Sequence, residues 1–262
     1  MNVRGYSVGP IACRAAFTAD FSVPPDVTPE QLVNHAERDR PQMDGRPGMR
    51  HKYTPLRFDP AVGTIESGGR YLFDRPEDAI DYFRFTTSEL QIEPGVFFWD
   101  RPFFLDVDMR VWHVIGAEDF APIATHYVNR LERLSYAATT TAITGDLAAA
   151  WLTMSEQARR QGLATAWLLI ATDDSQIGIV TAATKSPGND AAQSASRSLA
   201  QLERTESLSR LLPPEVCIAR EFDRTGLTLS VWLPKSRIVD GDAAAFPTYP
   251  LYPRPLDGGS DG

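Results

Sequence analysis

The pattern of apolar and polar positions predicts the same order of elements twice along the chain. Strand, helix, strand, strand, helix and strand are expected between Tyr6 and Asp119, and again between Tyr136 and Leu233. The two halves share little residue identity, so the repeat is one of structure. One such unit leaves a face of its sheet uncovered, whereas two units can cover each other and enclose a pocket between sheet and helices. The sequence therefore predicts an α+β fold of tandem ferredoxin-like (dimeric α+β barrel) repeats, whose antiparallel sheets carry helices on one face.

Cap and turn residues place the elements of the first half. Thr28 is a candidate helix N-cap with Pro29 at the first helical position. Gly68 and Gly69 indicate a bulge or a close approach of two strands. In this half we expect strands at 10–21, 51–58 and 64–74, a strand or hairpin at 96–114, and helices that begin at Pro29 and Pro76.

The second half is expected to begin with a linking helix at 121–134. The elements expected after it are a strand at 137–143, a helix from Gly145 through Ala158, hairpin strands at 165–172 and 177–183, a helix at 190–212, and strands at 217–222 and 227–233. The predicted division of the chain is a domain at 1–119, the linking helix within 120–135, a second domain at 136–240 and a Pro/Gly-rich tail at 241–262. The tail is expected to be extended, with disordered last residues.

Composition narrows the partners and the compartment. A formal net charge of −8 over 262 residues opposes binding to nucleic acid or to an anionic membrane. Cys13 and Cys217 lie far apart, which provides neither a metal-ligand spacing nor a disulfide framework. The first residues lack the apolar core of a signal peptide, and no window reaches the ~18 apolar residues of a membrane span. We therefore expect a cytoplasmic protein without a nucleic-acid or membrane partner.

Several well-known catalytic motifs are missing from the sequence. It contains neither G-x-G-x-x-G after a predicted strand nor G-x-x-x-x-G-K-[ST], so it encodes no Rossmann or P-loop phosphate site. It also lacks the G-x-S-x-G elbow of α/β-hydrolases. The four histidines are not at metal-ligand spacing, and we expect no metal. His35 and His126 are expected to be solvated.

The strongest positive signal is the aromatic segment at 96–114, VFFWDRPFFLDVDMRVWHV. If it is extended, its side chains alternate between two faces, so Arg110 and Trp112 share one face and His113 lies on the other. A sheet wall that mixes aromatic rings with Asp, Arg and His suits a flat apolar ligand that carries a few oxygen atoms. The alternative is that the aromatic residues fill the core and the charged residues form a solvated face.

The candidate site combines this segment with the strands beside it. His51 and Tyr53 share one face at the start of a strand, and an imidazole with a pKa near ~6.5 can accept a phenol proton at neutral pH. His113 lies within an apolar run, where a core histidine is the alternative reading. We predict His51, His113 and Arg110 as catalytic residues. The predicted substrate-binding residues are Tyr53, Tyr71, Tyr82, Phe97, Trp99, Arg101 and Trp112.

Two stretches carry a family resemblance. Residues 68–83, GGRYLFDRPEDAIDYF, resemble the strand-to-helix signature of dimeric α+β barrel proteins, which include antibiotic-biosynthesis monooxygenases, polyketide cyclases and heme-degrading enzymes. The opening VRGYSVGPIACRAAF, together with the length, the tandem arrangement and the Arg/Ala-rich composition, is similar to the ring-opening oxygenases of angucycline pathways, of the jadomycin, gilvocarcin and kinamycin type.

The resemblance implies a Baeyer-Villiger-like cleavage of a C–C bond in a polycyclic aromatic polyketide. It implies molecular oxygen and reduced flavin (FADH2 or FMNH2) as co-substrates, a separate flavin reductase that supplies the flavin, and a homodimer. A polyketide cyclase and a cofactor-independent, quinone-forming monooxygenase on the same fold remain alternatives. A heme protein with His113 as ligand and a carrier that shields a reactive quinone remain open too.

Overall fold

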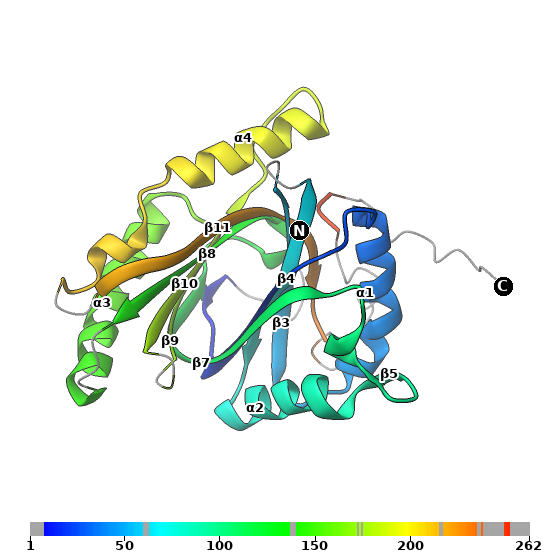
Figure 1. Ribbon diagram of the computed structural model, residues 1–262. Coiled ribbons are helices and arrows are strands. Elements are labelled where there is room, and N and C mark those ends of the chain that lie inside the picture. Colours follow the sequence, from blue (N-terminus) through cyan, green and yellow to red (C-terminus); the bar gives the residue numbers. More distant parts are fainter. Residues whose placement is uncertain are drawn as a thin grey trace.

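Eight antiparallel strands close into a barrel, and four helices lie against its outside (Figure 1). The computed structural model describes residues 8–59, 63–136, 140–171, 173, 175–214, 217–234, 237 and 249–251. The barrel strands are β2 (Ala15–Ser22), β3 (Met49–Asp59), β4 (Thr64–Phe73), β7 (Leu105–Asp119), β8 (His126–Tyr136), β9 (Thr165–Ala171), β10 (Gln176–Thr184) and β11 (Cys217–Trp232). The helices are α1 (Pro29–Asp44), α2 (Pro76–Arg84), α3 (Thr140–Arg160) and α4 (Ala191–Arg204).

The barrel contains two groups of four strands with the same internal order. Within the sheet the first group runs β7-β2-β4-β3 and the second runs β11-β8-β10-β9. In each group, the strand that comes last along the chain therefore pairs with the strand that comes first. This is the strand order of a ferredoxin-like unit. The groups meet at two seams, β3 with β11 and β7 with β9. Short β1 (Gly9–Pro10) pairs with the end of β7, and β5 (Gln91–Glu93) pairs with β6 (Val96–Phe97) outside the barrel. That the two groups form a tandem repeat stays a prediction.

Local sequence signals account for the helix starts and for one close approach of strands. Thr28 caps α1: its side chain accepts a hydrogen bond from the Gln31 N–H at 3.3 Å, and the Gln31 side chain accepts one from the Thr28 N–H at 2.7 Å. Asp190 caps α4 in a similar way. A Cβ added to Gly68 would lie 2.1 Å from the Ala19 carbonyl oxygen, so β2 and β4 can pair here only because Gly68 has no side chain.

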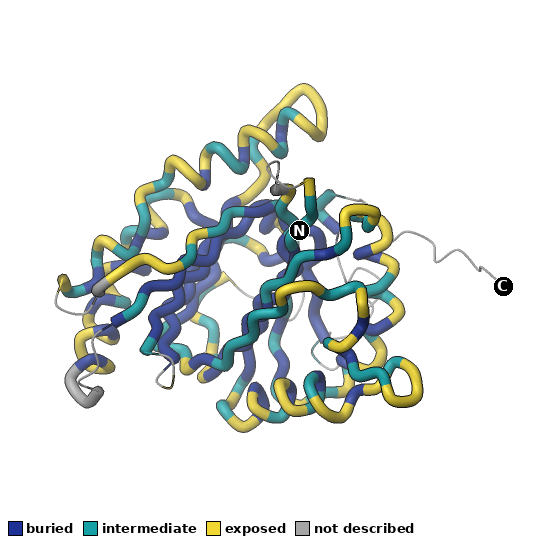
Figure 2. The backbone as a smooth tube through the Cα atoms, viewed as in Figure 1, coloured by how far each residue is buried: buried dark blue, intermediate teal, exposed yellow. Residues whose placement is uncertain are grey.

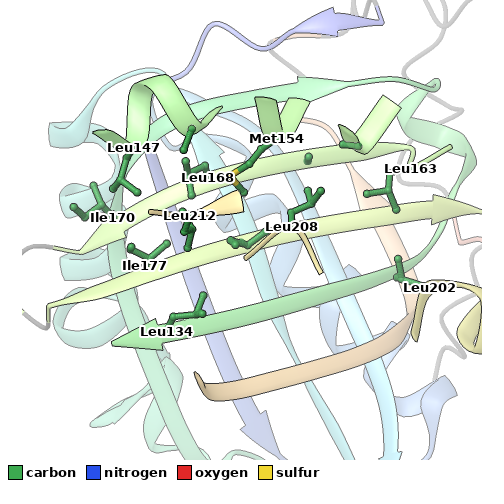
Figure 3. Packing of buried hydrophobic residues seen from close by; sticks show 14 of the residues in the cluster. Leu134, Leu147, Met154, Leu163, Leu168, Ile170, Ile177, Leu202, Leu208 and Leu212 are labelled. Atoms are coloured by element: carbon green, nitrogen blue, oxygen red, sulfur yellow. The ribbon is translucent and has the colours of Figure 1, made fainter. Parts of the chain in front are cut away.

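The two faces of the barrel wall pack differently. Figure 2 shows most of the barrel strands buried and the helices exposed along their outer sides, while part of β11 is exposed. The barrel interior is filled by large rings, including Tyr53, Trp112 and Trp167, together with smaller apolar side chains. Between the second group of strands and its helices lies a dense aliphatic core, which contains Leu147, Met154 and Leu168 (Figure 3). The described part of the chain contains no helix that is long and apolar enough to cross a membrane.

The predicted linking helix at 121–134 is wrong. After a single 3-10 turn at Ile123–Thr125, the chain forms strand β8. Both faces of β8 are buried, with Leu131 in the barrel interior and Val128 and Leu134 in the aliphatic core outside it. A strand that is buried on both faces loses the alternation that would reveal it.

Three other expected elements in the second half differ from the structure. Residues 140–143 belong to α3 rather than to a strand, and 137–139 lie outside the described residues. Helix α4 ends at Arg204, and a separate 3-10 turn, Leu208–Leu211, follows. The two strands expected from 217 to 233 are one continuous strand, β11. Gly226 marks a close approach there rather than a turn, since its Cβ would lie 2.8 Å from the Leu56 carbonyl oxygen.

The segment at 96–114 is not one extended strand either. Residues 98–104, called the aromatic segment below, form a 3-10 turn at Phe98–Asp100 followed by an irregular turn, and β7 begins only at Leu105. Arg101-Pro102 interrupts the run at this point, because proline cannot donate to a strand ladder. Of the predicted tail at 241–262 the structure describes 249–251, where Tyr249 is buried against Leu32 and Val33 of α1.

Helix α3 packs onto β7 through an indole ring placed on a glycine. A Cβ at Gly116 would lie 2.2 Å from the Trp151 ring. We expect Gly116→Ala to lower the free energy of unfolding by ~1–3 kcal/mol, since the added methyl group must displace that ring. Gly145→Ala, on α3 with no atom within 4 Å of its Cβ, is the matched control and should stabilise the helix by up to ~1 kcal/mol. Urea unfolding of both variants checks the pair, and a neutral Gly116→Ala would contradict the packing.

Candidate functional site

A narrow cleft lies between α1, the outer face of β3 and β4, and the aromatic segment. Its volume is about 50 Å³. One wall of this aromatic cleft is the inner stripe of α1, with Leu32, His35, Ala36, Asp39 and Met43. The opposite wall is the sheet, with Lys52, Thr54, Ser67, Gly68 and Tyr71. The aromatic segment and Phe21 of β2 close the cleft with Phe98, Trp99, Phe103 and Phe104.

The rings that close the cleft form a continuous cluster. Ring centroids are 4.7 Å apart for Phe21 and Phe104, 4.7 Å for Phe98 and Trp99, and 4.9 Å for Trp99 and Phe104. Most of these pairs are tilted or edge-to-face, which is the favourable arrangement for aromatic quadrupoles. Phe21 reaches the cluster from a register shift in the pairing of β2 with β7, between Asp20 and Ser22. The cleft therefore presents flat apolar surfaces to a ligand.

A buried ion pair ties the aromatic segment to α1. Arg101 Nη1 lies 2.9 Å from Asp39 Oδ2, and the two residues are only 7% and 4% exposed. Arg101 Nε also donates to the Phe98 carbonyl at 3.0 Å, and its guanidinium lies 4.3 Å from the Phe98 ring centre. Burial lowers the pKa of Arg101, while the Asp39 carboxylate opposes that shift. The pair therefore fixes the position of the aromatic segment at the expense of desolvating two charges.

The cleft also carries N–H donors and positive charge. Arg38 Nη2 lies 2.8 Å from His35 Nδ1, and because a guanidinium only donates, the His35 proton is on Nε2. Burial and the neighbouring Arg38 lower the pKa of His35, so it is neutral at pH 7. The buried Nε1–H of Trp99 has no hydrogen-bond partner among the described residues. Lys52 Nζ lies 5.0 Å from the Tyr71 ring centre.

Three of the ten predicted site residues meet at this cleft, and a fourth packs behind it. Tyr71 and Trp99 line it, and Arg101 anchors its aromatic segment. Tyr82 of α2 lies 4.9 Å from Tyr71, ring centre to ring centre, and its hydroxyl donates to Met43 Sδ at 3.3 Å. Phe97 is half-buried on β6 and does not line the cleft.

The other predicted site residues lie elsewhere. His113 is exposed on β7. Arg110 is at one end of the barrel, where its Nε donates to Gln176 Oε1 at 2.8 Å and Asp108 lies 3.1 Å away. Trp112 is in the barrel interior, where its Nε1 donates to Thr18 Oγ1 at 2.9 Å. The sequence analysis grouped these residues with Phe97, Trp99 and Arg101 because it treated 96–114 as one strand, whereas β7 begins only at Leu105.

His51 and Tyr53 are fully buried inside the barrel. The Tyr53 hydroxyl donates to His126 Nδ1 at 2.5 Å, because His126 Nε2–H donates to the Ala121 carbonyl at 3.0 Å. The His51 ring lies 5.2 Å from the Tyr53 ring and 5.3 Å from the Trp167 ring. Burial lowers the pKa of His51 to about 3 and that of His126 to about 4. His126 is thus a core residue, and the expectation that it is solvated is wrong.

Sequence reasoning missed the contribution of α1 to the cleft. His35 was expected to be solvated, yet it is half-buried and its ring centre lies 4.2 Å from that of Phe103. The signal was present, because positions 32, 36, 39 and 43 follow a helical spacing and all line the cleft. The polar side chains of His35 and Asp39 concealed this stripe.

The corresponding space in the other half of the barrel is occupied. There, between α3, α4 and the strands β8, β9 and β10, leucine, isoleucine and methionine side chains pack together (Figure 3). The described residues contain no group of three or more His, Cys, Asp or Glu that could hold a metal ion. The aromatic cleft is therefore the candidate functional site.

Comparison with known proteins shows the fold. No protein-family model matches the chain, and no curated protein matches it. A proposed monooxygenase from Lactobacillus acidophilus NCFM is similar in structure, with a TM-score of 0.50 and 9% identity over 82% of this chain and 93% of that one. An anthrone oxidase-like protein aligns with a TM-score of 0.48 and 9% identity, over 88% of this chain and 99% of that one. At this identity the likeness to the Lactobacillus protein shows a shared fold and nothing further.

The buried histidines predict a pH dependence of stability. Their pKa values are lower in the folded protein than the usual ~6.5, so the unfolded chain binds more protons and stability falls as pH decreases from about 6.5 toward 4. At ~1.4 kcal/mol per pKa unit, each histidine accounts for a change of up to roughly 3–5 kcal/mol in the free energy of unfolding over this pH range. Buried Asp119, whose pKa burial raises to about 7, acts oppositely: its contribution is present below pH ~4 and is lost as pH rises toward 7.

The two histidines lower stability on acidification and Asp119 raises it, so we expect a net fall in the free energy of unfolding as the pH decreases. Urea unfolding between pH 4 and 7.5 measures it. His126→Gln should give a shallower dependence than the unmodified protein, whereas His113→Gln, at an exposed position, should leave the dependence unchanged. Equal slopes for all three proteins would show that His126 is not held neutral by burial.

Proposed function

We propose that the protein is an oxygenase that binds a planar, polycyclic aromatic substrate in the aromatic cleft. The observation that carries the proposal is the combination of a ring-lined slot with N–H donors and cations at the same place. Phe21, Trp99 and Phe104 offer surfaces on which a flat ring system can stack. A quinone or polyphenol carries oxygen atoms at its edge, and these are the acceptors that such donors require.

The polar residues of the cleft are suited to deprotonate a phenol or an enolizable ketone and to stabilise the resulting anion. Lys52 and Arg101 favour the ionised substrate, since nearby positive charge stabilises a phenolate or enolate. The Nε2–H of His35 and the Nε1–H of Trp99 can donate to its oxygen atoms. Asp39 is the one carboxylate among the described residues that line the cleft, and we assign it the role of proton acceptor. The ionised ring is electron-rich, which is the form that reacts with an oxygen species.

The finer reaction rests on the sequence resemblance. We propose a Baeyer-Villiger-like opening of an angucycline quinone, in which one atom of O2 enters a ring C–C bond. The other atom leaves as water, with two electrons from reduced flavin. A cofactor-independent oxidation to a quinone and a cyclisation are the alternatives, and the same donors would serve both. A separate flavin reductase, a homodimer and a cytoplasmic location stay predictions.

The size of the cleft limits what can bind in this conformation. A volume of about 50 Å³ is far below the ~300–1,000 Å³ of small-molecule pockets and holds neither an isoalloxazine nor a fused polyketide. Substrate entry requires the aromatic segment to move away from α1, which separates Arg101 from Asp39. Opening thus releases the carboxylate assigned as proton acceptor from Arg101, while Arg38 of α1 stays beside it, with its Nε 3.5 Å from Asp39 Oδ1.

Oxygen uptake and product mass test the proposed reaction. The purified protein is mixed with an angucycline-type quinone, with and without chemically reduced FMN or FAD. Uptake that depends on reduced flavin, with a product that gains oxygen and loses a ring bond, is the expected result. Uptake without flavin and with a quinone product would support the cofactor-independent alternative. A changed substrate without uptake would identify a cyclase, and ligand binding without turnover would identify a carrier.

Removal of the proposed base should reduce turnover. We expect Asp39→Asn to lower kcat by ~10²-fold or more, the usual contribution of a general base. Glu30→Gln makes the same chemical change at an exposed position in the first turn of α1 and is the matched control, with kcat unchanged. Thermal midpoints of both variants separate loss of the base from loss of the fold. Full turnover by a folded Asp39→Asn protein would move the base to another residue.

The Trp99 indole N–H provides a second test of the same cleft. Trp99→Phe keeps an aromatic ring in the wall but removes the donor, and we expect the quinone to bind roughly fivefold more weakly, the equivalent of one net hydrogen bond of ~1 kcal/mol. Phe97→Leu, at a half-buried residue beside the cleft, is the control and should bind normally. Equilibrium titration of the quinone measures both, and unchanged binding by Trp99→Phe would remove this residue from the site.

A further inference from the structure

A polar cavity distinct from the aromatic cleft lies at one end of the barrel. It has a volume of about 420 Å³, within the ~300–1,000 Å³ range of small-molecule sites. It forms where both seams open. The ladder of β7 with β9 covers only His113 to Asp119, and that of β11 with β3 covers only Leu227 to Trp232. In the described part of the chain, the leading halves of β7 and β11 therefore each have one strand neighbour, and they border this barrel mouth.

Alternating charges line the barrel mouth. Arg70 pairs with Asp20, and Arg133 pairs with Asp108. Glu66 lies between Arg224, with which it pairs, and Arg57, whose Nη1 is 3.1 Å away. Together with Asp106 the lining has four arginines and four carboxylates, so its formal charge is zero. A net anion or cation would gain nothing overall and would compete with an existing pair.

The alternation also disfavours a zwitterion. The two ends of a zwitterion need separate positive and negative poles, but each arginine here already lies beside a carboxylate. A hydroxyl group, by contrast, can accept from a guanidinium and donate to a carboxylate at the same time. Both contacts are charge-assisted and leave the ion pairs intact. A ligand with several hydroxyl groups and no net charge matches this lining best.

Ordered side chains form the floor and the rim of the barrel mouth, so the cavity is separated from the rest of the barrel interior. Trp112, hydrogen-bonded to Thr18, fills the barrel below the mouth. Buried Asn129, which lines the cavity, donates to Thr228 Oγ1 at 3.1 Å. Asp106 at the rim has a φ of 50°, one of two positive values among the described non-glycine residues. Left-handed backbone at a cavity rim is a feature of ligand sites, and Asp is among the residues that tolerate it.

We propose that the barrel mouth is a second binding site, for a neutral polyhydroxylated compound such as a sugar unit. The ligand would lie over the alternating pairs, with its hydroxyl groups between guanidinium and carboxylate. The proposal does not rest on the oxygenase reaction: of the residues that line the two cavities only Phe21 and Ser67 are shared, and the charged pairs of the barrel mouth do not line the aromatic cleft.

Direct binding of named probes tests the proposal. Maltose and methyl β-D-glucopyranoside are compared with glycine as zwitterion and sulfate as anion, by saturation-transfer NMR and calorimetry on the full chain. Saturable one-to-one binding of a sugar probe, with no binding of glycine or sulfate, is expected. Stronger binding of glycine or sulfate, or no saturable binding of either sugar, would overturn the proposal.

Two variants locate the binding. Ser22→Trp fills the cavity without removing an ion pair and should weaken sugar binding at least tenfold, whereas Thr184→Trp, at an exposed position on β10, should not. Asp106→Asn keeps the shape and the tolerated backbone angle but removes a charged acceptor, and should weaken binding severalfold even if Ser22→Trp fails to fold. Undiminished binding by Asp106→Asn and any folded Ser22→Trp would overturn the assignment. Oxygen uptake should be the same in all three, which separates this site from the oxygenase.

Discussion

Backbone hydrogen bonding across two seams holds the molecule together. Each group of four strands ends in two open edges, and an unpaired edge exposes N–H and C=O groups that must find partners. The pairing of β3 with β11 and of β7 with β9 satisfies those edges within one chain. Closure also creates the two environments of the protein, a sealed interior and an outer face covered by helices. The positions of both cavities follow from it.

The sealed interior explains why several reactive side chains are structural. His51, His126 and Tyr53 lie inside the closed sheet, where desolvation keeps both imidazoles neutral and the Tyr53 hydroxyl is held by His126. Among the described residues the seams lack strand pairing at the barrel mouth, and there ion pairs such as Arg133–Asp108 and Arg224–Glu66 connect the strands. The barrel mouth is polar because backbone pairing stops before the strands do.

The two outer faces differ in how their helices pack. Against α3 and α4 the space is filled by branched aliphatic side chains, which interdigitate closely. Against α1 the chain inserts the aromatic segment, and rings meeting at tilted angles leave a slot that aliphatic packing would fill. One buried ion pair, Arg101–Asp39, holds that segment down. The aromatic cleft, which is the place most suited to bind a flat ligand, is thus held closed by an ion pair between two desolvated charges.

Local signals in the sequence determined much of the first half. The Thr28 cap, the helix start at Pro76 and the glycines of β4 appear where they were expected, because caps, prolines and close approaches depend on residues near in sequence. Trp99 and Arg101 were predicted from the aromatic run at 96–114 and Tyr71 from the strand at 64–74, and all three lie at the cleft. Only the tertiary structure decided that 121–134 contains a strand, since burial on both faces erases the alternation. It alone placed His35 and Asp39 in the cleft and His51 in the core. The helical spacing of 32, 36, 39 and 43 indicates one buried stripe, but what that stripe packs against depends on strands and loops far away in sequence.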